Sequence, residues 1–165
     1  MSSFAIEKSL ERARRRLGDG RSHRSDRGAR RLPPELQTHL QDLLSGHDRP
    51  PVRQLRATLG RFCERRGLPV PARATLYSFM QTAPTPLYRI EELPDAVRRT
   101  LHNVAQDADV PGPILVRRAF EAGSLAAVSY ASSLPWLCLY QADRLRGWRP
   151  KSHAMLRAVM RFRRI

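Results

Sequence analysis

Apolar residues recur at helical spacing along most of the chain, in stripes that begin near proline and end near glycine or a turn. Between residues 32 and 104 this pattern predicts four amphipathic helices, at about 34–45, 51–66, 71–81 and 94–104. The positions expected to face inward are Leu36, Leu40, Leu43, Leu44, Val52, Leu55, Leu59, Phe62, Leu76, Met80, Val97, Leu101 and Val104. The first three helices are expected to form a compact core.

The same pattern continues after a turn-rich segment at 107–113. It predicts helices at 114–122, 125–133, 136–146 and 151–163, with Ser124 as the N-cap of the second. The last helix would bury its apolar side, formed by Met155, Leu156, Val159, Met160 and Phe162. A short β-prone run at 87–90 could be one strand of a wing, although no second strand is evident.

The N-terminal segment has a different pattern. Residues 4–17 fit an amphipathic helix, whereas 18–31 hold no apolar residue except Ala29 and cannot bury enough surface to fold alone. This basic stretch could be an arm that follows DNA phosphates or simply a solvated tether. We therefore expect three parts: the N-terminal helix and linker at 1–31, a helical domain at 32–106, and a C-terminal helical domain at 107–165.

One long uncharged stretch raises the question of a membrane. Residues 123–142 contain no charge over twenty positions, which is long enough to cross a bilayer. Pro135 in its middle, four serines and Gln141 favour a buried pair of helices instead. The first ten residues include Glu7 and Lys8 and are not followed by the apolar block of a secretory signal. We expect no membrane partner.

Charge points toward a polyanionic partner. The chain carries a formal net charge of +15, and the excess lies in residues 1–31 and 144–165, on either side of a nearly neutral middle. Such ends suit nucleic acid. Only Lys8 and Lys151 among thirty basic residues are lysines. This excess of arginine over lysine favours a nucleic-acid partner, because arginine makes bidentate contacts to phosphate and guanine. A GC-rich genome would produce the same excess.

The cysteine count favours a reducing compartment. Cys63 and Cys138 each fall within a predicted helix and cannot support a disulfide framework. Together with the charge, this suggests a cytoplasmic protein of bacterial or phage type, associated with the nucleoid.

The stretch from Arg61 to Met80 carries the most informative motif. A basic helix is expected to end at Gly67, a stiff Leu-Pro-Val-Pro connector follows, and a second helix begins near Pro71. This stretch resembles the helix-turn-helix units of Mu-type transposases and integrase-like proteins. The residues that match their pattern are Gly67, Leu68, Pro69, Pro71, Thr75 and Leu76. Ala72 stands where that family often has serine. The resemblance implies a helix-turn-helix domain whose second helix reads DNA.

A second, shorter stretch resembles another helix-turn-helix family. Residues 125–147 are similar to the terminal unit of Fis-type regulators, and the matching positions are Leu134, Leu139, Tyr140 and Arg144. Pro135 replaces the usual capping residue, and Asp143 adds a negative charge. The expected fold class is therefore mainly α: a helix-turn-helix bundle that could be winged, with a second helix-turn-helix-like unit.

These motifs select the candidate DNA-binding residues. In the first unit, arginine would contact guanine or phosphate, glutamine would contact adenine, and the threonine methyl group would meet thymine. A solvated helix face is the alternative for all of them. The first-unit candidates are Arg61, Arg65, Arg66, Arg73, Thr75, Tyr77, Ser78, Gln81 and, on the strand, Arg89. The second-unit candidates are Gln141, Arg144, Arg146, Arg149 and Lys151, near Trp136 and Trp148.

The sequence gives little support for catalysis. The five histidines are scattered, no cysteine sits at metal-ligand spacing, and no glycine-rich phosphate loop follows a strand. We therefore expect neither enzyme activity, nor a metal, nor a cofactor.

The leading hypothesis is a sequence-specific double-stranded DNA-binding protein, acting as a transcriptional regulator or as an accessory factor of a mobile element. One alternative is an RNA- or single-strand-binding protein, because arginines beside aromatics can stack bases. Another is a protein-interaction adaptor, such as an antitoxin or an assembly partner. In that case Trp136, Leu137, Leu139 and Tyr140 would dock a protein partner, and the chain could also pair with itself as a homodimer.

Overall fold

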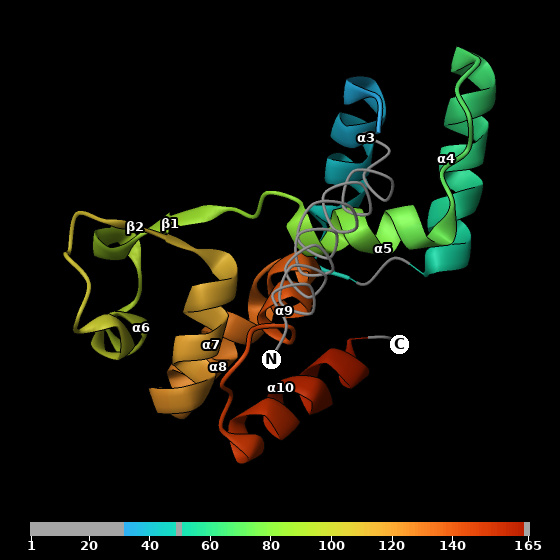
Figure 1. The fold of residues 1–165 in the computed structure, drawn as a ribbon. Coiled ribbons are helices and arrows are strands. Elements are labelled where there is room, and N and C mark those ends of the chain that lie inside the picture. The colour runs from blue at the N-terminus through green and yellow to red at the C-terminus, as the bar shows by residue number, and fades with distance from the viewer. Residues whose placement is uncertain (1–31, 49–50, 164–165) are drawn as a thin grey trace, which may run out of the picture. The chain divides into compact units, whose positions relative to one another are not determined.

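The helical stripes predicted from the sequence form eight α-helices in the part of the chain that the structure describes (Figure 1). The structure is a computed structural model that describes residues 32–48 and 51–163. The helix predicted at 4–17 and the linker at 18–31 lie outside these residues. From Pro34 to Ile165 the chain forms one compact unit, and the fold is mainly helical, as expected.

The first three helices carry the predicted leucine stripes on their buried sides. They are α3 (Pro34–Leu44), α4 (Val52–Arg66) and α5 (Arg73–Thr82). Leu36, Leu40 and Leu44 are buried on α3; Leu55, Leu59 and Cys63 are buried on α4; Leu76 and Met80 are buried on α5. Val52, Leu43 and Phe62 are only half-buried, so each apolar stripe is narrower than predicted.

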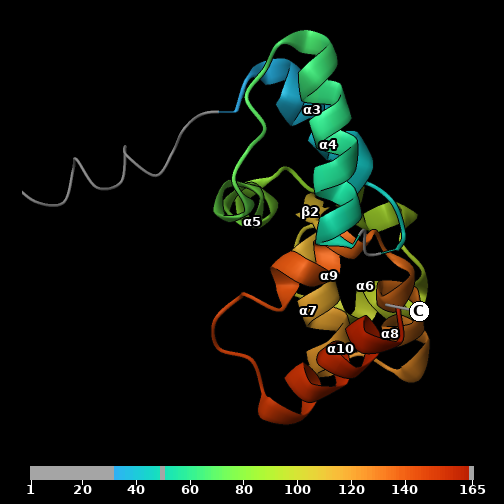
Figure 2. The same ribbon diagram turned by 90° about the vertical axis from the view of Figure 1, so that its right-hand side faces the viewer.

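The connection between α4 and α5 differs from the tight turn expected for a helix-turn-helix. Gly67 ends α4 in the left-handed conformation, with φ of 62°, as predicted. Residues 68–72 then run back along α4 before α5 begins (Figures 1 and 2). A fifteen-residue helix rises about 22 Å, and the six residue steps from Gly67 to Arg73 span about 20 Å when extended. The connector thus returns the chain close to the start of α4.

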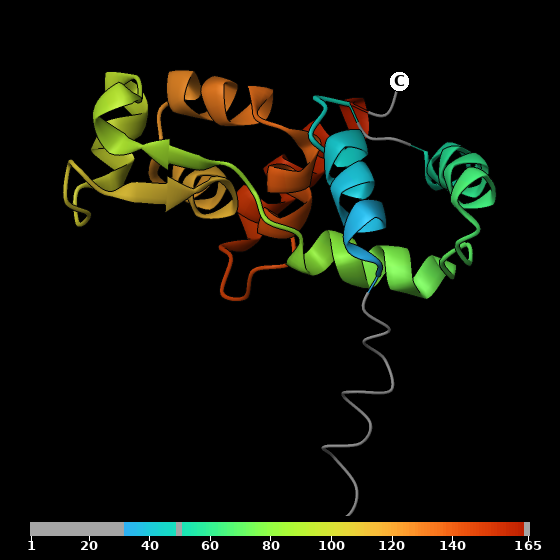
Figure 3. The same cartoon turned by 90° about the horizontal axis from the view of Figure 1, so that it is seen from above.

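A small antiparallel sheet supplies the second strand that the sequence did not reveal. Strand β1 (Leu87–Arg89) pairs with β2 (Asp109–Pro111), with Tyr88 opposite Val110 (Figure 3). β2 lies in the segment that the turn residues marked as a domain boundary, so hydrogen bonds cross the predicted division at residue 107.

Short helical segments fill the connection between the two strands. They are the 3-10 helix η1 (Ile90–Glu92), α6 (Asp95–Arg98) and the 3-10 helix η2 (Arg99–Leu101). Val97 and Leu101 are buried as expected. Val104 is 37% exposed, and the helix predicted to reach it ends earlier.

The C-terminal helices are α7 (Gly112–Ala122), α8 (Leu125–Ser133), α9 (Trp136–Ala142) and α10 (Pro150–Phe162). Ser124 caps α8 as predicted, and its Oγ accepts a hydrogen bond from the Ala127 N–H (3.4 Å). Helix α9 ends four residues before the predicted end at Arg146. On α10, Leu156 and Met160 are buried, whereas Met155 and Phe162 are exposed, contrary to expectation.

Helix α9 lies at the centre of the C-terminal packing. Trp136, Leu137, Cys138, Leu139 and Tyr140 are all 5% exposed or less. The uncharged stretch 123–142 is interrupted at Leu134-Pro135, where α8 ends and α9 begins. Within the described residues, no helix combines the length and the apolar character needed to cross a membrane.

Gly112 lies where α7 packs closely against α9. A Cβ atom at this position would lie 2.5 Å from the Cys138 sulfur and 3.2 Å from the Tyr88 ring. A contact that short forces the neighbouring side chains to move.

We therefore expect Gly112→Ala to lower the free energy of unfolding by about 1–3 kcal/mol. Gly60→Ala is a matched control, because Gly60 lies inside α4 and a Cβ there would meet no atom within 4 Å. That substitution should stabilise the protein by up to about 1 kcal/mol, the difference in helix propensity. Urea denaturation of both variants measures the two effects, and a neutral Gly112→Ala variant would contradict the close packing.

Candidate nucleic-acid interface

Positive charge is concentrated on α4 and the start of α5. Residues 51–82 contain six arginines and a single carboxylate, Glu64. Helix α4 buries only the stripe Leu55, Leu59 and Cys63, which leaves its five arginines on the surface. The net charge of residues 32–143 as a whole is close to zero, which conceals this local concentration.

Contacts with α3 fix the C-terminal half of α4. Phe62 stacks on His39 of α3 with 4.3 Å between ring centroids, and Arg66 Nη1 lies 3.1 Å from Glu35 Oε2. Arg66 is therefore already paired with a carboxylate. Arg61 and Arg65 are exposed, and Arg65 Nε donates to the backbone oxygen of Arg61 (3.3 Å). The three candidate arginines that precede the connector are thus not equivalent.

Helix α5 presents its candidate residues at different depths. Ser78 and Gln81 are exposed, whereas Thr75 and Tyr77 are half-buried beside the buried Leu76 and Met80. The two exposed side chains, Ser78 and Gln81, are the ones able to reach a base edge.

Arg73 begins α5 and is held against the next turn of that helix. Its Nη2 donates to the Tyr77 hydroxyl (3.1 Å), and its guanidinium carbon lies 5.5 Å from the Tyr77 ring centroid. This contact with a neutral partner orients the guanidinium, and no carboxylate of the described residues pairs with its charge.

Arg73 also lies beside two arginines that the sequence analysis did not single out. Arg53 and Arg56, in the first turns of α4, line the same hollow as Arg73, together with Val52, Ala57 and Val70. The hollow measures about 410 Å³. The hollow exists because the connector runs back along α4. A count of charges over residues 51–82 alone would have marked Arg53 and Arg56 as candidate binding residues.

Arg89, expected to reach a minor groove from the strand, is instead surrounded by carboxylates. Its Nη1 lies 3.3 Å from Glu91 Oε1, and its Nε lies 3.9 Å from Asp109 Oδ1 on the paired strand. These contacts compensate its charge within the sheet.

The C-terminal candidates do not form one surface. Gln141 is half-buried, and its Nε2 donates to the backbone oxygens of Met80 (3.1 Å) and Ala83 (2.7 Å) at the end of α5. The Arg144 guanidinium carbon lies 3.5 Å from the centroid of the Tyr140 ring. Arg149 contacts the backbone of Glu121, while Arg146 and Lys151 are exposed.

Burial also excludes two roles that the sequence suggested for α9. A recognition helix must expose one face to enter the major groove, and α9 exposes none. The docking surface expected for an adaptor, formed by Trp136, Leu137, Leu139 and Tyr140, is absent for the same reason, since these side chains form the core. Trp148 is half-buried and donates from Nε1 to the Ala142 oxygen (2.8 Å).

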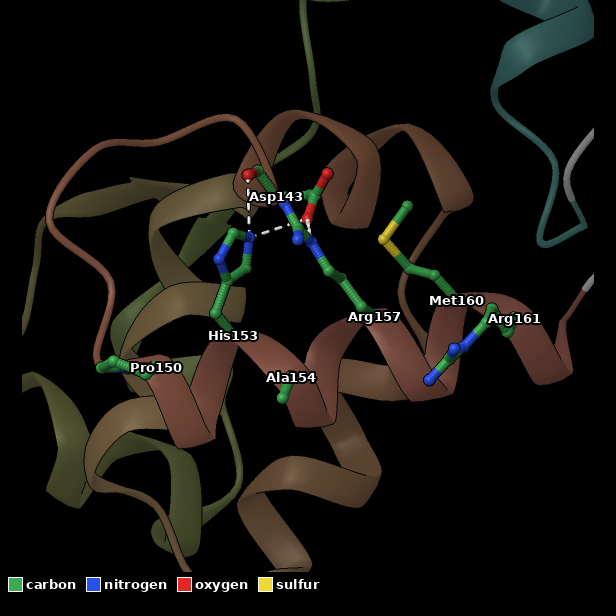
Figure 4. Close-up of a pocket in the computed structure, with 7 residues that line it drawn as sticks. All are labelled: Asp143, Pro150, His153, Ala154, Arg157, Met160 and Arg161. Atoms are coloured by element: carbon green, nitrogen blue, oxygen red, sulfur yellow. Dashed lines mark hydrogen bonds and ion pairs between the residues drawn. The ribbon is translucent and has the colours of Figure 1, made fainter.

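A second hollow, of about 600 Å³, lies along α10 and contains the main polar cluster of the C-terminal region (Figure 4). Asp143 Oδ1 accepts hydrogen bonds from His153 Nε2 (2.7 Å) and Arg157 Nε (2.9 Å). Burial favours the neutral acid, but the hydrogen bonds from Arg157 and His153 outweigh it and lower the pKa of Asp143. The cluster joins the end of α9 to α10.

Neither cysteine is positioned for reaction. Both are buried and free, and burial raises the pKa of the Cys138 thiol to about 11. Among the described residues, no three histidine, cysteine, aspartate or glutamate side chains come together in a way that could hold a metal ion.

Comparison with known proteins gives no relative. The chain matches no protein-family model, and neither the curated proteins nor the solved structures contain a match.

The Asp143 cluster generates a prediction for pH-dependent stability. The folded pKa is lowered, so the ionised carboxylate contributes stability above its unfolded pKa of about 3.9, and this contribution is lost as the pH falls through the lower folded value. We expect Asp143→Asn to cost about 1–3 kcal/mol at pH 7. The cost should shrink as the pH falls below about 4.

Urea denaturation at pH 7 and pH 3 measures both effects. Asp107→Asn is the matched control, because Asp107 is exposed and pairs with no cation among the described residues. Equal stability of the wild type and Asp143→Asn at pH 7 would show that the cluster contributes nothing.

Proposed function

We propose that this chain is a cytoplasmic double-stranded DNA-binding protein that uses the surface of α4 and α5, as a transcriptional regulator or an accessory factor of a mobile element. The observation that carries the proposal is the charge of 51–82. Of the six arginines there, only Arg66 pairs with a carboxylate among the described residues. The other five guanidiniums lie on α4 and at the start of α5, where like charges repel, and a bound polyanion relieves that repulsion.

The outward face of α5 supplies groups suited to base recognition. Ser78 and Gln81 lie about one turn apart and are both exposed. A glutamine amide can donate to adenine N7 and accept from the adenine N6 amino group, and a serine hydroxyl can bond to several bases. Arginines on α4 would hold the phosphates beside them. Base contacts therefore come from α5 and phosphate contacts from α4.

The sequence led us to expect DNA contacts from two helix-turn-helix-like units, whereas this proposal places the recognition helix in the first unit alone. Because α9 is buried, it has no face that could enter a major groove, so the role of this helix is structural. Gln141 ties α9 to the C-terminal end of α5 and fixes the orientation of that helix.

We expect purified protein to bind duplex DNA with an affinity that falls steeply as salt rises, and to enrich a motif from a random pool. Contact with about six phosphates would give a slope of log K against log salt near −5. A steep slope without an enriched motif would leave a non-specific binder, and absence of binding at moderate salt would refute the proposal.

Gln81→Ala tests the base contact. The variant should lose about 1–3 kcal/mol of binding free energy at one base position of the selected site and nothing on scrambled DNA. Gln106→Ala, an exposed glutamine outside α4 and α5, is the control. Equal losses on selected and scrambled DNA would exclude Gln81 as a base reader.

A further inference from the structure

The hollow between the first turns of α4 and the returning connector combines three cationic groups with an apolar lining. Arg53, Arg56 and Arg73 contribute the guanidiniums, and Val52, Ala57 and Val70 contribute the apolar surface. Arg53 and Arg56 lie on α4, and Arg73 begins α5, 17 to 20 residues later in the sequence. Figure 2 shows the connector passing alongside α4, which is how these helices meet.

The arginines of this hollow have no acidic neighbour among the described residues. Within the described residues, Arg53 and Arg56 form no ion pair and no side-chain hydrogen bond, and Arg73 bonds only to the neutral Tyr77 hydroxyl. By contrast, six arginines lie within 4 Å of a carboxylate: Arg66, Arg89, Arg98, Arg117, Arg144 and Arg157. The hollow therefore concentrates three charges that no carboxylate of the described residues neutralises.

The lining narrows the class of ligand. Guanidinium groups bind oxyanions through paired N–H donors, and phosphate oxygens match that geometry. Val70 is 47% exposed and, with Val52 and Ala57, offers a surface suited to the carbon face of a sugar. A bare inorganic anion would leave this apolar surface in water. A phosphodiester with its sugar would use both features.

We infer that this hollow holds one phosphodiester group and the adjoining sugar of a nucleic-acid backbone, with Arg53, Arg56 and Arg73 as its phosphate ligands. The inference rests on the proposed function and makes it more specific. It reassigns Arg73 from the base-reading role expected from the sequence to a sequence-independent contact. Phosphate contacts set the register of the protein on the duplex, and Gln81 then meets a base edge.

The test compares two double variants of the full chain that lose the same charge. Arg53→Ala/Arg56→Ala removes two ligands of the hollow. Arg99→Ala/Arg118→Ala removes two exposed arginines of η2 and α7 that also form no ion pair among the described residues. Binding is measured by fluorescence anisotropy across a salt series, on selected and scrambled duplex DNA, single-stranded DNA and RNA. Thermal unfolding checks that each variant is folded.

We expect the hollow variant to bind at least about tenfold more weakly at moderate salt, equally on selected and scrambled DNA, and its salt slope to fall by about 2. Arg73→Ala should show the same equal loss, with a slope lower by about 1. The control should change affinity by less than about threefold, the effect of net charge alone. The nucleic acid that the wild type binds most tightly, among duplex DNA, single-stranded DNA and RNA, is the one that supplies the phosphodiester.

Two results would overturn the inference. If the hollow variant matches the control on every nucleic acid while the wild type binds, the hollow is not a ligand site and the proposed function survives. If Arg73→Ala loses affinity only on the selected sequence, Arg73 reads a base. Failure of the wild type to bind any nucleic acid would instead remove the proposed function, and the inference with it.

Discussion

The return of the chain between α4 and α5 is the constraint on which the proposed interface depends. Gly67 ends α4 because it adopts a positive φ at no steric cost. Pro69 and Pro71 then fix their own φ and push the residues before them into extended conformations, so the connector cannot coil. An extended connector about as long as α4 brings Arg73 back beside Arg53 and Arg56. A shorter or helical connector would separate these groups.

The opposite end of α5 is fixed by a different interaction. The last carbonyl groups of a helix have no partner within it, and Gln141 of α9 donates to two backbone oxygens there. Because α9 is itself buried, α5 is anchored to the core at its C-terminal end and to the connector at its N-terminal end. A helix held at both ends presents Ser78 and Gln81 in a fixed orientation, which base recognition requires.

Local signals predicted the helices well, whereas long-range contacts lay beyond them. Gly67, Ser124 and the prolines act on their immediate neighbours, and the ends they predicted are close to those observed. Strand β2 was missed because a three-residue strand has no periodicity, and only pairing with β1 makes it a strand. Gln141 was interpreted as a surface residue, since nothing in its surroundings shows that the end of α5 lies against it. The hollow was missed because its arginines come from two predicted helices.

The pairing of each arginine carries more information than the number of arginines. A GC-rich genome would explain an excess of arginine over lysine, but it would not decide which arginines acquire a carboxylate neighbour in the fold. Arg117 and Arg157 pair with Glu121 and Asp143 on the C-terminal helices and contribute to the packing there. On α4 and α5 a single glutamate accompanies six arginines, so repulsion among them is tolerated at some cost in stability. Such a cost is typical of a surface shaped for a ligand, because the bound anion removes it. The uneven distribution of carboxylates is therefore the stronger argument for a polyanion partner.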